Sequence, residues 1–259
     1  MMKIDKYYRD AACVSLNGSI AALVPAVLII IVDLSFFRNK EIMMLTIPFL
    51  IYSFISFQIY LFKVRQAIFI KRNMLKSSSF YHSIFETEHL LAVYLPKRLQ
   101  FFFPDGHLAG EIKKYRGKKF CFPVFSKIYA LYDFNHQLIG IYKVKQGKHK
   151  KIEVFDRNKA YQGYYQIRKL NMRKFKKELF DTNERFIGAV EGASLFMDEK
   201  IINSANRQLG RLRRGWMPLE WSKFFPEPNT PVLSFSEGIS EQDKLLQMSF
   251  LINEYFIER

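Results

Sequence analysis

The sequence predicts a mainly β domain that contains one buried C-terminal helix and follows a hairpin of two transmembrane helices. Three observations predict this architecture. An eight-residue turn pattern recurs along the second half of the chain, two long apolar stretches lie near the N-terminus, and one short apolar segment ends the chain. The 259 residues are enough for one sizeable domain and an appendage.

The turn pattern places Asp, Asn, an apolar residue and Gly at fixed positions. Its three copies are Asp133-x-Asn135-x-x-Leu138-x-Gly140, Asp156-x-Asn158-x-x-Tyr161-x-Gly163 and Asp181-x-Asn183-x-x-Phe186-x-Gly188, and a shorter relative begins at Asp105. Asp and Asn bond to their own backbone and tolerate left-handed conformations, so they favour a tight turn. The Gly indicates a β-bulge or the close approach of another part of the chain. The copies start 23 and 25 residues apart, a spacing that suits antiparallel hairpins and is short for strand-helix-strand units.

Short aromatic and β-branched runs separated by turn signals continue through residues 80–259. The strand candidates are Leu99–Phe103, Leu108–Lys114, Lys127–Tyr132, Leu138–Lys145, Lys151–Phe155, Ala160–Arg168, Met172–Phe180, Phe186–Val190 and Gln208–Arg213. Roughly ten to twelve strands fit the available length, which favours a barrel or a sandwich over an open sheet.

The N-terminal segment, residues 1–76, has the composition of a membrane anchor. No charged residue occurs from Ala11 to Val32, and Ile42 to Phe62 is also uncharged, which predicts transmembrane helices at about 14–36 and 42–62. A cleaved signal peptide is the alternative for the first stretch, but its apolar region is too long and a second span follows at once. Basic and apolar residues alternate in residues 63–76, which predicts a juxtamembrane helix.

The distribution of Lys and Arg predicts the orientation of these helices. Eight basic residues lie before the first span or after the second, and only Arg38 and Lys40 lie in the turn between the spans. We therefore expect a multi-pass protein of the cell membrane with both termini in the cytoplasm. Asp33 is expected to reach interfacial water or to pair with Arg38, and a functional intramembrane carboxylate is the alternative.

The C-terminal segment predicts a helix over 241–257. Ser240 is a suitable N-cap, and Glu241 and Asp243 suit a first helical turn. Apolar residues occupy much more than one face of this helix, which is typical of a helix buried on most sides. We expect it to run through the middle of a closed barrel, and a helix packed on the edge of a sandwich is the alternative.

Residues 80–259 resemble the tubby-like superfamily, which includes the tubby C-terminal domain, the LURP-one-related proteins and the phospholipid scramblases. The resemblance rests on the repeated turn, best seen in Asp133–Gly140, and on the apolar terminal helix Lys244–Ile257. It implies a twelve-stranded barrel threaded by a hydrophobic helix, and the whole chain resembles a bacterial membrane protein with a tubby-like cytoplasmic domain. It also implies binding to membrane lipids in the tubby branch and lipid scrambling in the scramblase branch. No tubby phosphoinositide motif aligns with this chain, so the resemblance assigns no lipid-site residue.

Positive charge is concentrated in residues 143–177, which hold thirteen basic and two acidic residues. Lys143 and Lys145 share one strand face while Tyr142 and Val144 share the other, so we expect one basic patch on adjacent hairpins. An ordinary solvated face is the alternative. The candidate lipid-binding residues are Lys143, Lys145, Lys148, Lys150, Lys151, Arg168, Lys169, Arg173, Lys174, Lys176 and Lys177.

The sequence contains no convincing catalytic motif, so we expect no enzyme activity and no cofactor. A metal site at His82, Glu86, Glu88 and His89 is conceivable, but isolated residues beside a linker are more often solvated, so we expect no metal. The two cysteines offer no disulfide framework, which fits a reducing compartment. The favoured function is binding of anionic lipid head groups at the inner leaflet. A membrane-tethered protein-interaction module and a scramblase-like activity are the alternatives, and no nucleic acid partner is expected.

Overall fold

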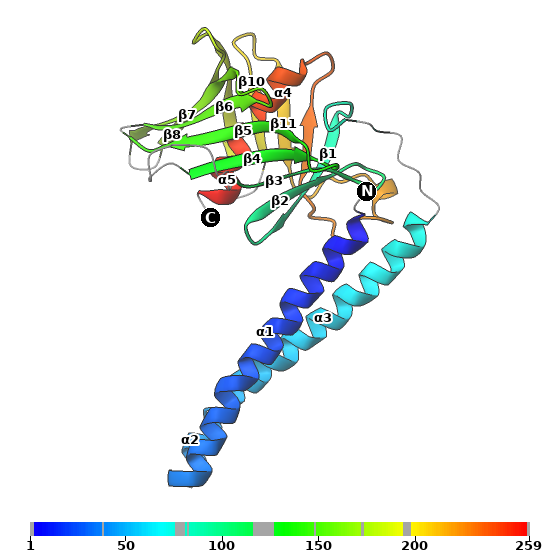
Figure 1. The fold of residues 1–259 in the computed structure, drawn as a ribbon, viewed down its shortest axis with the longest axis vertical. Helices are drawn as coiled ribbons and strands as arrows, with labels where there is room; N and C mark the ends of the chain where they lie inside the picture. The colour runs from blue at the N-terminus through cyan, green and yellow to red at the C-terminus, as the bar shows by residue number, and fades with distance from the viewer. Residues whose placement is uncertain are drawn as a thin grey trace. The chain divides into compact units, whose positions relative to one another are not determined.

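The computed structural model describes residues 3–37, 39–75, 81, 83–115, 127–147, 149–171, 174–193 and 198–257. Two compact units make up the chain. One unit comprises residues 3–77, and the other comprises residues 78–259. The first unit is a helical hairpin and the second is a β-barrel (Figure 1).

The helical unit consists of α1 (Ile4–Val32), a π-helical turn (Asp33–Phe37), α2 (Lys40–Met44) and α3 (Ile47–Met74). Two segments, Ile4–Phe36 and Lys40–Met74, are long and apolar enough to cross a membrane. Several of the buried residues of α1 and α3 are small, and Ser19 Oγ donates a hydrogen bond from α1 to the Ser53 carbonyl of α3 at 2.9 Å. Large side chains such as Leu28 and Phe54 point outward, as expected for helices that meet lipid.

The helices extend further than the sequence pattern predicts. Helix α1 starts at Ile4, before the predicted start of the first span at about residue 14. The predicted second span is divided between α2 and α3 by a turn at Leu45 and Thr46, and α3 then continues without a break through the predicted juxtamembrane helix. Asp33 is 3% exposed, and its Oδ1 accepts a hydrogen bond from the Asn39 backbone N–H at 2.8 Å. The carboxylate therefore stabilises the turn between the helices, whereas its expected partner Arg38 lies outside the described residues.

Twelve strands of the described chain form a closed antiparallel barrel. They are β1 (His89–Leu95), β2 (Arg98–Phe102), β3 (Leu108–Lys114), β4 (Lys127–Asp133), β5 (Leu138–Lys145), β6 (Lys150–Asp156), β7 (Tyr161–Asn171), β8 (Lys174–Phe180), β9 (Phe186–Ala193), β10 (Asp198–Ile202), β11 (Gln208–Arg213) and β12 (Val232–Phe235). Each strand pairs with its neighbours in sequence, and β12 closes the ring against β1. The predicted mainly β barrel is confirmed, and the nine strand candidates correspond to β2–β9 and β11.

The recurring turn pattern forms one end of the barrel, which we call the turn end. In the first full copy, Asp133 Oδ1 accepts hydrogen bonds from the backbone N–H groups of Asn135 at 2.8 Å and Gln137 at 2.7 Å. Asn203 does the same in a fourth copy, which the sequence pattern misses because Asn203, Ala205 and Gln208 replace its Asp, Asn and apolar residue. The fourth residue of each full copy has positive φ: His136, Lys159, Glu184 and Asn206. These equivalent turns join consecutive strands of the meander.

The Gly of the pattern lies at a β-bulge or against another segment, as the sequence predicts. Gly163 follows a register shift between β6 and β7 and has φ +128°, and a Cβ there would lie 2.2 Å from the Phe180 carbonyl oxygen. Gly140 serves a different contact, since a Cβ at this position would lie 2.5 Å from Leu245 Cδ1 in the barrel interior. The pattern thus sets both the curvature of the wall and the room inside it.

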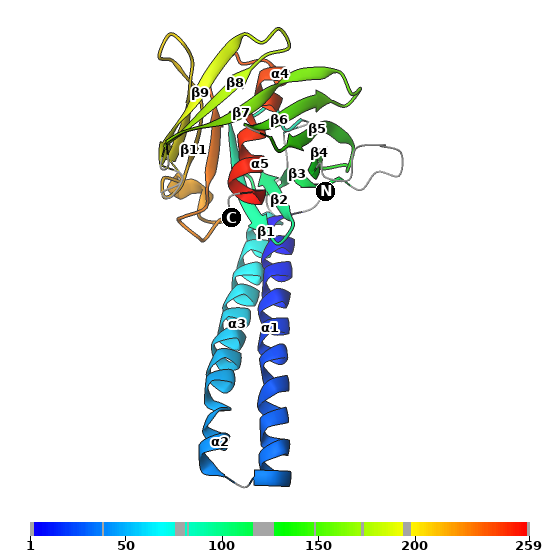
Figure 2. The ribbon, with the colours of Figure 1, turned by 90° about the vertical axis from the view of Figure 1, so that its left-hand side faces the viewer.

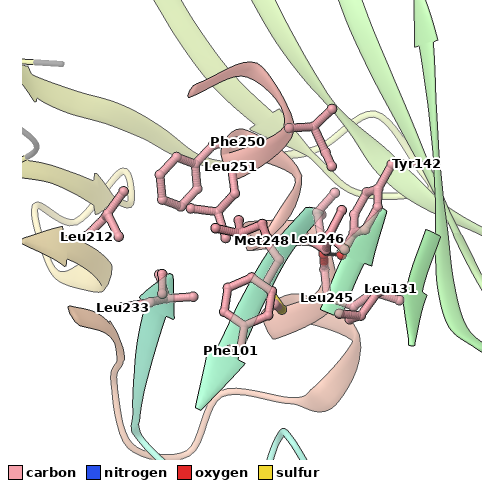
Figure 3. Close-up of a cluster of buried hydrophobic side chains, with 14 of the residues drawn as sticks. Phe101, Leu131, Tyr142, Leu212, Leu233, Leu245, Leu246, Met248, Phe250 and Leu251 are labelled. Carbon is pink, nitrogen blue, oxygen red and sulfur yellow. Dashed lines mark hydrogen bonds between the residues drawn. The ribbon is translucent and has the colours of Figure 1, made fainter. Parts of the chain in front are cut away.

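The predicted C-terminal helix lies inside the barrel, as two segments, α4 (Glu241–Gln247) and α5 (Ser249–Phe256). All residues from Lys244 to Tyr255 are buried, so strands surround these segments on every side (Figure 2). Figure 3 shows Leu245, Leu246, Met248, Phe250 and Leu251 facing the inner side chains of the strands. The helix is interrupted where Ser249 Oγ donates to the Leu246 carbonyl at 2.6 Å, a bond that bends helices.

Gly163→Ala should destabilise the barrel by about 3 kcal/mol or more, because the new Cβ meets a backbone oxygen and the left-handed conformation disfavours Ala. Gly147→Ala is the matched control, since its nearest neighbour would lie at 3.8 Å, and should cost less than about 1 kcal/mol. Urea denaturation of both variants measures the difference. Similar losses would contradict the close approach at Gly163.

Candidate functional site

Five of the predicted lipid-binding residues point outward from one part of the barrel wall. Strand alternation separates them from the core, because the side chains between them, such as Val144, Ile152 and Ile167, belong to the buried interior cluster. We call these five the outer basic face: Lys143, Lys145, Lys151, Arg168 and Lys176.

Strand pairing brings the residues of the outer basic face together across β5–β8. Lys145 pairs with Lys151 across β5 and β6, and Arg168 pairs with Lys176 across β7 and β8. Two carboxylates lie among them. Glu153 forms an ion pair with Lys145, and Glu178 lies 3.2 Å from Arg168 and 2.8 Å from Lys176. Five cations therefore face two carboxylates, which leaves an excess of three positive charges on this surface.

An aromatic pair lies beneath the lysines of this face. The Nζ of Lys151 lies 3.5 Å from the centre of the Tyr164 ring, a cation–π contact, and Tyr164 stacks on Phe180 at 4.9 Å. Burial, followed by the charge of Glu184, raises the pKa of Tyr164, so its phenol is neutral at physiological pH. The neutral Tyr164 ring therefore contacts the Lys151 ammonium group without cancelling its positive charge.

Two other predicted lipid-binding residues face the interior instead. Lys150 Nζ donates to Asn253 Oδ1 of α5 at 3.0 Å, and Lys177 Nζ forms ion pairs with Glu199 at 2.8 Å and Glu254 at 2.7 Å. Asn253, Glu199 and Glu254 are all buried. These lysines attach the enclosed helix to the wall and do not belong to the outer basic face.

The interior ion pairs keep Lys177 charged. Burial alone would lower the pKa of Lys177, but the charge of Glu199 and hydrogen bonds to Glu199 and Glu254 outweigh it and raise the pKa. The stability from this pairing is fully present below the ordinary lysine pKa of 10.5 and is lost as the pH rises through the higher pKa of the folded protein.

Two of the remaining candidates, Lys169 and Lys174, lie near the end of the barrel opposite the turns, which we call the far end. Lys169 is exposed where β7 approaches this end, and for Lys174 only the backbone is described. Lys148 and Arg173 lie outside the described residues. Lys145 and Lys151 also flank the β5–β6 connection at the far end. The strands that leave Gly140 and Gly163 thus carry their positive charge away from the repeated turns.

The turn end has the opposite character. An open pocket of about 410 Å³ lies there between two of the repeated turns, the start of α4 and the segment that precedes β1. Its charged lining residues are Asp133, Asp156, Arg157 and Glu241. Three carboxylates against one cation make this pocket unsuitable for an anionic head group, so the outer basic face is the better candidate site. Within the described residues, no group of three His, Cys, Asp or Glu side chains could hold a metal ion.

Comparison with known proteins gives one structural likeness. It is the X-ray structure of a LURP-one-related protein from Arabidopsis thaliana, with 13% sequence identity and a TM-score of 0.42, and the match covers 66% of this chain and 91% of that one. No protein-family model and no curated protein matches the sequence. The closed twelve-stranded barrel around a C-terminal helix is itself the fold that the resemblance to the tubby-like superfamily implies.

Lys177→Met should destabilise the barrel by about 3–5 kcal/mol, because it leaves two buried carboxylates without their cation. Lys176→Met, one residue away, is the control. Lys176 is 54% exposed in its pairing with Glu178, so its loss should cost less than about 1 kcal/mol. Chemical denaturation at neutral pH measures both. Equal losses would show that Lys177 does not hold the enclosed helix.

Proposed function

We propose that this protein is anchored in a membrane and that its barrel binds anionic lipid head groups through the outer basic face. The observation that carries the proposal is the cluster of five cations and two carboxylates on adjacent strands of a chain that also has two helices apolar enough to span a membrane. The function is recognition of a surface, with no chemical step.

The charge excess is large enough to hold the barrel at a lipid surface. A basic residue near an anionic membrane contributes on the order of 1 kcal/mol, so an excess of three charges corresponds to about 3 kcal/mol. The interaction decays within a Debye length of roughly 8 Å at physiological salt, so it requires close contact. Anchoring by the helices keeps the barrel near the bilayer, where an attraction of this size is sufficient.

We also propose that α1 and α3 both cross the membrane and that both termini are cytoplasmic. Lys3, Lys6 and Arg9 precede the first span, and five basic residues follow the second, whereas the intervening turn holds two. This orientation presents the barrel to the inner leaflet, whose anionic lipids match the outer basic face. A protein-interaction module held at the membrane and a scramblase-like activity are the competing functions.

The barrel alone, residues 78–259, should bind anionic vesicles. This fragment contains all twelve strands and the enclosed helix with their core, so we expect it to fold by itself. In sedimentation with phosphatidylglycerol-containing vesicles, binding should be strong at low salt and weaken steeply as salt is added. Lys145→Gln, Lys151→Gln and Lys176→Gln together should reduce affinity by about a hundredfold.

A triple variant at the turn end is the matched control. Arg157→Gln, Arg185→Gln and Arg207→Gln remove the same charge from exposed sites at the opposite end and should change affinity much less. Equal effects of the two triple variants would contradict a defined binding face, and absence of binding at low salt would overturn the proposal. A stoichiometric crosslinked protein partner unaffected by the lysine variants would favour the interaction module.

The orientation of the helices predicts the accessibility of two positions in a variant without Cys13 and Cys121. A membrane-impermeant maleimide should label Asn39→Cys in intact cells, because the turn between the helices is outside. Gln146→Cys in the barrel should be labelled only after the membrane is permeabilised. Labelling of Gln146→Cys in intact cells would show that the barrel lies outside and would contradict the proposed orientation.

A further inference from the structure

The β7–β8 hairpin extends past β6 at the far end, and it separates there from β9. Pairing of β6 with β7 runs only as far as Lys150 and Ile167, and pairing of β8 with β9 begins at Glu178 and Ala189. Within the described residues, 168–171 of β7 and 174–176 of β8 therefore pair only with each other. We call this two-stranded extension the β7–β8 tip. Two-stranded ribbons are marginally stable in water, so a projecting one is suited to contact with another surface.

The β7–β8 tip exposes large apolar side chains between cations. Leu170 is 60% exposed and Phe175 is 55% exposed. Phe175 lies opposite Lys169, and the two residues share one face of the ribbon, whereas Leu170 shares the other face with Arg168. Each face of the tip thus combines an apolar side chain with a cation, the composition of segments that bind at a membrane–water interface.

We propose that the β7–β8 tip inserts Leu170 and Phe175 into the interface of an anionic bilayer while the flanking cations contact head groups. This inference rests on the proposed function and deepens it, because it adds a salt-resistant apolar contact to the electrostatic one. The tip continues the outer basic face, since Arg168 and Lys176 belong to both.

A bilayer fits this surface better than a protein partner does. Cations accompany the apolar side chains on both faces of the ribbon, whereas the centres of protein interfaces are depleted of charged residues. At a lipid interface, both faces of the tip can contact anionic head groups and acyl chains at the same time. The apolar helices of the same chain also make a bilayer the available surface.

The test uses single-cysteine versions of the full chain, with Cys13 and Cys121 replaced by Ser. Leu170→Cys and Phe175→Cys carry an environment-sensitive fluorophore in vesicles of phosphatidylcholine alone or with phosphatidylglycerol. The control is Phe186→Cys, which is 40% exposed but lies at the turn end. We expect blue-shifted emission and quenching by spin-labelled lipid at positions 170 and 175 in anionic vesicles, and neither effect at position 186.

A second measurement separates insertion from head-group binding. In the barrel fragment, Leu170→Ser with Phe175→Ser should reduce affinity for anionic vesicles about tenfold and remove the binding that persists at high salt. If the labels stay exposed to water while the unmodified barrel still binds, insertion is overturned and the proposed function stands. If the barrel does not bind, both fail. Emission that is equally blue-shifted in detergent, without lipid quenching, would indicate a protein contact and also overturn insertion.

Discussion

The barrel depends on the burial of its C-terminal helical segments, because a ring of twelve strands needs side chains to fill its interior. Twelve consecutive residues from Lys244 to Tyr255 supply this filling, and they contact inner side chains from strands all around the ring. The wall is shaped to admit them. Gly140 on β5 and Gly210 on β11 leave room for Leu245 and Gln247, since a Cβ at either position would lie 2.5 Å from the helical side chain. The closed ring of strands and the enclosed helical segments therefore depend on each other.

The same helix requires polar contacts inside the barrel. Tyr142 donates its hydroxyl proton to the Leu245 carbonyl at 3.1 Å, and the inward-facing lysines contact side chains of α5. The C-terminal end of α5 carries the negative end of the helix dipole, so cations at the adjacent far end stabilise it. Adjacent lysines consequently have different roles. Lys150 and Lys177 hold the helix, while their sequence neighbours Lys151 and Lys176 face outward.

The sequence predicts the hairpins well because their signal is local. Each Asp or Asn bonds to backbone groups two and four residues ahead, so the pattern and its geometry lie within eight residues. Strands β1, β10 and β12 are missed. Strand β10 begins with Asp198, Glu199 and Lys200, and its polar start is explained by partners on other strands, Arg211 on β11 and Lys177 on β8. Strand β12 has four residues, too few for a periodic signal.

The candidate site is predicted in part for a related reason. Local charge density identifies β5–β8 as basic, and alternation assigns Lys143 and Lys145 to one face of their strand. Neither signal can show that Lys177 points inward and meets buried carboxylates. Glu199 is 22 residues from Lys177 and Glu254 is 77 residues away, so their pairing exists only after the barrel closes around its helix. The fold therefore divides one cluster of positive charge in the sequence between lysines that hold the enclosed helix and cations on the outer basic face.

This division gives the barrel an electrical polarity along its axis. Asp105, Asp133, Asp156 and Asp181 are fixed at the turn end because their carboxylates organise the turns. The cations of the outer basic face and of the β7–β8 tip lie toward the far end, while Arg157, Arg185 and Arg207 accompany the carboxylates at the turn end. Under the proposed function, an anionic surface would attract the far end more strongly than the turn end, so it would orient the barrel as well as bind it. Orientation of this kind needs no pocket, which is consistent with a binding face formed by the outer wall and by a hairpin that extends beyond it.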